Sequence, residues 1–131
     1  MSSPNAAPGT AREWIERARA KLALAKVPLP TGGAWEDLCY MAQQSSELAI
    51  KAVFIQNGWR FPFIHDLDQL LTGLRSHGLA IPPTVQAADQ LTEYAVATRY
   101  PGIAPPVTKV EYDDAILIAD MVLAWANSLV P

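Results

Sequence analysis

Arg60 and His65 follow the pattern arginine, four residues, histidine, and their types suit chemistry at a phosphodiester. A guanidinium can hold a phosphate, while an imidazole can take or give a proton at the 2′-hydroxyl or the leaving oxygen. Such a pair could cleave RNA without a metal ion. The alternative is structural, because short spacings arise by chance. Asp66 also suits the start of a helix, which would fix His65 in a turn.

Glu47 and Lys51 stand four residues apart with the acid first, which places both on one face of a helix. One interpretation is an ordinary intrahelical ion pair. Lys51 also adjoins Ala52, a member of an apolar stripe, so the pair lies at the edge of the expected core. A polar pair in that position could line a groove, and this second interpretation makes Lys51 a candidate ligand for a phosphate.

Arg99 and Tyr100 precede Pro101, which disfavours helix at the residue before it. An arginine at a helix C-terminus is stabilised by the helix dipole, which is the structural interpretation. The functional alternative presents both side chains to a nucleotide. The tyrosine ring would then stack on the base, and the guanidinium would bind the phosphate.

Composition narrows the possible partners. The 131 residues suit one domain, and a net charge of −3 with a pI near 5.2 excludes broad electrostatic binding of DNA or RNA. This charge balance is compatible only with a small nucleotide or RNA site that has few basic groups. The single cysteine, Cys39, excludes an internal disulfide, and no glycine-rich phosphate loop is present. His65 and His77 lie at opposite ends of an expected helix and cannot share an ion, so we expect neither metal nor cofactor.

Proline and glycine clusters divide the chain into five segments of helical length and composition. We expect helices over residues 11–26, 35–57, 66–77, 82–97 and 109–130, the last opened by a capping box at Thr108–Glu111. The fold class is therefore all-α, a five-helix up-and-down bundle. Residues 1–10 resemble a frayed tail rather than a signal peptide, and residues 11–131 form one domain. The most apolar stretch is too short to span a membrane, so we expect a cytoplasmic protein.

The expected last helix is apolar on more than one face. Two interpretations are open, either a central position in the bundle or an interface with a second subunit. The low content of charged residues, 18%, fits both.

Two stretches together resemble the HEPN (higher eukaryotes and prokaryotes nucleotide-binding) domain family. The first, Gln43 to Leu71, reads QQSSELAIKAVFIQNGWRFPFIHDLDQLL, and the second, Ala97 to Gly102, reads ATRYPG. The family pattern has Glu-Leu-Ala-x-Lys-Ala on a helix, His-Asp-Leu opening the next, and Arg-Tyr-Pro after the fourth. An early helix with Trp14 looks like the family's first helix, so the likeness extends over nearly the whole chain.

This resemblance implies a five-helix, commonly dimeric domain of the type that forms the substrate-binding subunit of a minimal nucleotidyltransferase. Some such pairs act as toxin and antitoxin, and many members are metal-independent ribonucleases with an arginine–histidine motif. The resemblance implies that Arg60 and His65 form this motif and are the catalytic residues. It implies nucleotide or RNA binding by Lys51, Arg99 and Tyr100, and supporting roles for Glu47 and Asp66. The alternative function is a non-catalytic helical module for dimerisation or interaction.

Overall fold

The structure is a computed structural model that describes residues 8–95, 101–102 and 104–131. All regular secondary structure in these ranges is helical, which confirms the all-α prediction. The elements are α1 (Ala11–Ala25), α2 (Trp35–Gln56), α3 (Leu67–Ser76), α4 (Pro83–Gln86), the 3₁₀ helix η1 (Ala87–Ala95) and α5 (Lys109–Leu129). Of the tail expected over residues 1–10, only residues 8–10 are described.

Side-chain caps fix where three of the helices begin. Thr10, Asp66 and Thr108 precede α1, α3 and α5, and each accepts a hydrogen bond from the backbone N–H three residues later. Such a bond satisfies one of the donors that a helix leaves free at its first turn. The N–H of Thr108 donates in return to the Glu111 carboxylate at 3.0 Å, which completes the expected capping box.

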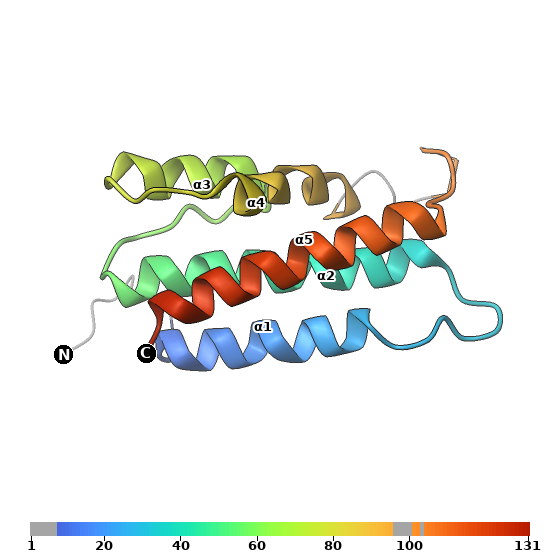
Figure 1. The fold of residues 1–131 in the computed structure, drawn as a ribbon, viewed down its shortest axis with the longest axis horizontal. Helices are drawn as coiled ribbons and strands as arrows, with labels where there is room; N and C mark the ends of the chain where they lie inside the picture. Colours follow the sequence, from blue (N-terminus) through green and yellow to red (C-terminus); the bar gives the residue numbers. More distant parts are fainter. Residues whose placement is uncertain (1–7, 96–100, 103) are drawn as a thin grey trace.

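The three long helices α1, α2 and α5 lie side by side, and the chain runs back and forth along the long axis of the molecule (Figure 1). The central helix is α2, which packs against α1, α5, η1 and α3. The shorter elements α3, α4 and η1 form a layer on the side away from α1 (Figure 1). The largest fully buried side chains include Ile15, Ile50, Phe54, Leu67, Leu70, Leu71, Leu74 and Leu91.

The fourth segment differs from the single helix expected over 82–97. A four-residue α-helix passes into a 3₁₀ helix that ends at Ala95, and residues 96 and 97 lie outside the described part. Val85, Ala88, Leu91 and Tyr94 are buried, and they recur at every third residue. Ala88, Leu91 and Tyr94 lie in the 3₁₀ helix, which has three residues per turn and so aligns them on one face, and Val85 precedes them in α4.

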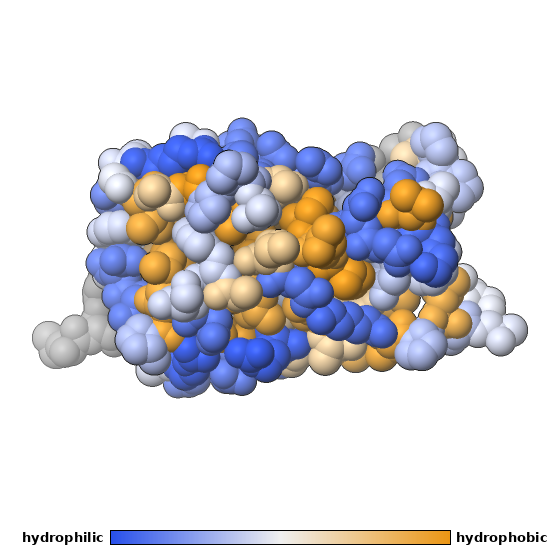
Figure 2. Space-filling view, viewed as in Figure 1, coloured by the Kyte–Doolittle hydropathy of each residue, from blue (hydrophilic) through white to orange (hydrophobic). Residues whose placement is uncertain are grey.

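One side of the last helix packs into the domain, whereas its interpretation as an interface with a second subunit stays a prediction. Ala115, Ala119, Val122 and Ala126 are buried inside the chain, and the other side of the helix leaves Val110, Leu117 and Met121 exposed. Apolar side chains are visible between polar ones on the face where α5 lies (Figure 2). No helix in the described ranges has both the length and the apolar character needed to cross a bilayer.

Candidate functional site

The segment between α2 and α3 carries the arginine–histidine pair. Gly58 ends α2 with φ near +70°, a conformation that glycine adopts without steric cost. The N–H of Trp59 then donates to the carbonyl of Phe54 at 2.9 Å, which closes the end of the helix. The chain that follows runs past the side of α2 and delivers His65 to a carboxylate on that helix.

Glu47, Lys51 and His65 form one charged cluster. Glu47 Oε1 lies 2.8 Å from His65 Nδ1, and Glu47 Oε2 accepts a hydrogen bond from Lys51 Nζ at 3.0 Å. The side chains of Glu47 and Lys51 are only 12% and 9% exposed, whereas the His65 side chain is 74% exposed. The sequence pair Glu47–Lys51 is thus the inner part of a three-residue arrangement whose outer member reaches solvent.

Two further residues hold this cluster, and neither was among the candidates from sequence. Gln43 Nε2 donates to Glu47 Oε1 at 3.1 Å and reaches the backbone carbonyl of His65 at 3.5 Å. The ammonium of Lys51 lies 5.1 Å from the centre of the Phe61 ring, within range of a cation–π interaction. The spacing Gln43, Glu47, Lys51 places three polar residues on one helix face, a signal that was present in the sequence.

The geometry suits His65 to proton transfer. Because Nδ1 faces the Glu47 carboxylate, the opposite ring nitrogen, Nε2, is left for solvent or a ligand. A carboxylate that contacts one imidazole nitrogen orients the ring. Lys51 serves differently, since its charge is neutralised by Glu47 and its stem is buried.

The remaining candidates lie in different settings. Arg60 is exposed and forms no hydrogen bond or ion pair with His65 or any other described residue, so its guanidinium is available. Asp66 caps α3, where its two oxygens accept hydrogen bonds from the backbone and side chain of Gln69, each at 3.2 Å. Arg99 and Tyr100 lie outside the described residues.

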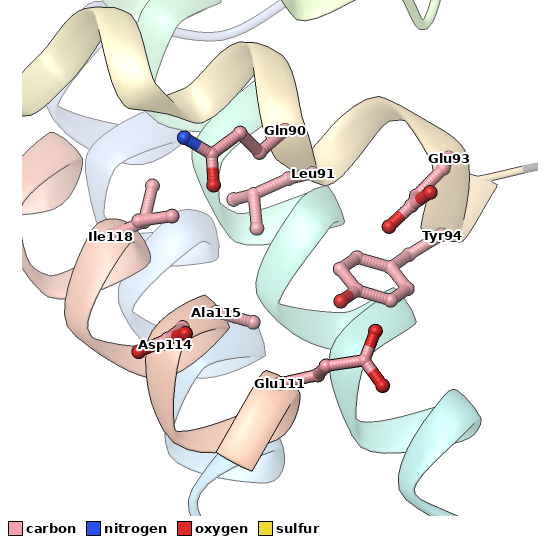
Figure 3. A pocket seen from close by; sticks show the side chains of 8 residues that line it. All are labelled: Gln90, Leu91, Glu93, Tyr94, Glu111, Asp114, Ala115 and Ile118. Atoms are coloured by element: carbon pink, nitrogen blue, oxygen red, sulfur yellow. The ribbon is translucent and has the colours of Figure 1, made fainter. Parts of the chain in front are cut away.

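A separate pocket of about 130 Å³ lies between η1 and α5 (Figure 3). Its polar lining includes the carboxylates of Glu93, Glu111 and Asp114 together with Tyr94, whose phenol pKa is raised, mainly by burial. Three carboxylates repel a phosphate, so this pocket does not suit a nucleotide's charged end. Nor does any group of three or more histidine, cysteine or acidic residues in the described ranges form a site for a metal ion.

The comparisons with known proteins define the class. The sequence profile of the HEPN domain matches residues 11–129, and the chain belongs to this family. The crystal structure of an archaeal HEPN homologue superposes with a TM-score of 0.71 at 26% sequence identity, over 92% of this chain and 97% of that one. No protein of curated function matches the sequence.

Proposed function

We propose that this HEPN domain binds a nucleotide or RNA beside the Glu47–Lys51–His65 cluster and cleaves RNA there without a metal ion. The observation that carries the proposal is the contact of Glu47 with His65 Nδ1, made while the imidazole itself is 74% exposed. An oriented imidazole with one nitrogen open to solvent is the arrangement that general acid–base catalysis requires.

In the proposed reaction a ribose 2′-oxygen attacks the adjacent phosphorus, and the bond to the 5′-oxygen breaks. The products are a 2′,3′-cyclic phosphate and a new 5′-hydroxyl. His65 Nε2 takes the proton from the 2′-hydroxyl while water protonates the departing 5′-oxygen, or His65 protonates the 5′-oxygen while water accepts the proton of the 2′-hydroxyl. Arg60 holds the phosphate, and Glu47 orients the imidazole. Lys51 keeps the Glu47 carboxylate in place, and Arg99 with Tyr100 completes the proposed nucleotide contacts.

The proposed assembly is a homodimer that partners a minimal nucleotidyltransferase, as a toxin and antitoxin pair or as its substrate-binding subunit. The support is family membership over residues 11–129 together with an exposed apolar stripe on α5, made of Val110, Leu117 and Met121. The same stripe favours a second candidate function, a non-catalytic module for dimerisation or interaction.

Cleavage of labelled tRNA and mRNA by the purified protein in excess EDTA tests the catalytic proposal. His65→Ala should abolish cleavage, and Glu47→Gln should reduce it. His77→Ala is the matched control, since His77 is also exposed but stacks on Trp59 at 4.1 Å, away from the cluster. Cleavage by His65→Ala at the parent's rate would rule out the ribonuclease and leave the interaction module.

A further inference from the structure

Phe63 is the most exposed large apolar side chain in the described ranges, with 93% of its surface accessible to solvent. It lies two residues before His65, in the segment that links α2 to α3. The N–H of Ile64 donates to the carbonyl of Pro62 at 2.9 Å, which makes Phe63 the central residue of a three-residue turn. A single backbone hydrogen bond therefore spans Phe63.

The Phe63 ring also contacts a second aromatic side chain. It lies edge-on to Phe61, with ring centres 6.0 Å apart and an interplanar angle of 68°. Phe61 in turn makes edge contacts with the core ring of Phe54 at 6.0 Å and with Trp14 at 5.6 Å. A series of aromatic contacts thus leads from the core to one outward-facing ring, which keeps 93% of its surface accessible to solvent.

The charged residues near Phe63 in the sequence favour a nucleic acid as its ligand. Arg60 is exposed and unpaired among the described residues, and the imidazole of His65 is open at Nε2. The acid nearest in sequence, Asp66, is engaged at the N-terminus of α3. One isolated ring is too small for a stable protein interface, but it matches the face of a single base. Basic residues three positions before it and two positions after it in the sequence are suited to the phosphates.

We infer that Phe63 is a stacking platform for an unpaired nucleobase, so that the substrate class of the site is single-stranded RNA rather than duplex. The inference rests on the proposed binding of nucleotide or RNA and adds the residue that selects unpaired bases. Proteins that bind single strands combine such aromatic faces with basic groups, and bases in a duplex are already stacked.

The test is fluorescence anisotropy of the full-length His65→Ala protein, which cannot cleave its ligand under the proposal. The probes are a labelled octanucleotide of adenylate, the same strand in a duplex, and an abasic strand of equal length. Phe63→Ala and Phe63→Leu should each weaken binding of the single strand by roughly five- to hundredfold. Phe63→Trp should retain it, and the duplex and abasic strands should bind weakly to every protein.

Val110→Ala is the matched control, because it removes an exposed apolar side chain from α5, away from the site. Circular dichroism of each variant before titration verifies that it is folded. If the single strand binds equally well to the Phe63→Ala and unaltered-Phe63 proteins, the platform is wrong while the proposed function stands. If the Phe63→Leu protein binds the single strand as tightly as the Phe63→Trp protein, residue 63 contributes by general hydrophobic contact and stacking is ruled out. If no strand binds to the protein with Phe63 intact, both the proposed function and the platform fail.

Discussion

The carboxylate of Glu47 and the imidazole of His65 lie 2.8 Å apart although 18 residues separate them in the chain. This contact joins the middle of α2 to the segment that leads into α3. The same carboxylate holds Lys51 at 3.0 Å, so one side chain on α2 serves both packing and the proposed chemistry. Changes at Glu47 should accordingly affect stability and activity together, and the two effects need separate measurements.

Replacing Glu47 should destabilise the domain through Lys51. Glu47→Gln leaves Lys51, whose side chain is only 9% exposed, without its counter-charge. Removing one member of a buried ion pair costs about 3 kcal/mol, because the remaining charge is desolvated without compensation. Urea unfolding followed by circular dichroism measures this loss.

Two comparisons make the Glu47 prediction specific. Lys109 and Asp113 form an exposed ion pair at 2.9 Å, and Asp113→Asn should cost less than about 1 kcal/mol. The double variant Glu47→Leu with Lys51→Met should be more stable than Glu47→Leu alone, because no unpaired charge remains. Equal losses for Glu47→Gln and Asp113→Asn would show that solvent screens Lys51 fully.

Asp66 should contribute to the stability of the fold and not to RNA cleavage. Its side chain caps α3, so Asp66→Ala should lower the free energy of unfolding by about 1 kcal/mol. Thr108→Ala at the start of α5 removes an equivalent cap far along the chain and should cost a similar amount. RNA cleavage at a temperature well below both melting points should match the parent for each variant. Loss of cleavage in Asp66→Ala alone would place this carboxylate in the reaction.

Much of the fold follows from local signals in the sequence. The prolines, the glycines and the Thr108–Glu111 capping box mark helix ends, and four of the five expected segments match helices to within one or two residues. The exception, residues 82–97, contains a short α-helix followed by a 3₁₀ helix, and the buried residues Val85, Ala88, Leu91 and Tyr94 recur there at every third position of the sequence.

The site was predictable only in part. The helix spacing places Glu47 beside Lys51, but the contact of Glu47 with His65 depends on how the segment after Gly58 folds back along α2. No periodicity describes such a segment. The contact of Phe61 with Lys51 was not predictable for the same reason, because it depends on where this segment places the ring relative to the Lys51 ammonium.

Stability should fall at alkaline pH because of Cys39. Burial, with smaller contributions from nearby carboxylates, raises the pKa of this thiol from 9.0 to about 12. The folded state therefore keeps a proton that the unfolded chain releases above pH 9, so the free energy of unfolding decreases between about pH 9 and pH 12. Burial raises the pKa of Tyr94 and Tyr112 as well, so both tyrosines also lower the free energy of unfolding as the pH rises.

Urea unfolding at several pH values in this range measures how steeply the free energy of unfolding falls with pH. Cys39→Ala should make this fall less steep, because it removes one of the groups that keep a proton in the folded state and lose it in the unfolded chain. The thiol should also react with iodoacetamide at pH 8.5 only at the rate of global unfolding, since it is fully buried. Rapid alkylation of the folded protein would contradict the burial on which both expectations depend.

A charge on the apolar stripe of α5 should break the proposed homodimer. Leu117 and Met121 stand four residues apart on the outer face of the helix, and both are exposed. Leu117→Glu should shift the protein from dimer to monomer in sedimentation velocity at micromolar concentration, because a carboxylate in an apolar interface loses its hydration.

Leu24→Glu is the matched control, since Leu24 is an exposed leucine on α1 and lies off the stripe. Circular dichroism spectra of both variants should equal the parent's, because neither side chain belongs to the core. A parent that sediments as a monomer, or a Leu117→Glu protein that remains dimeric, would show that the stripe is not the dimer interface.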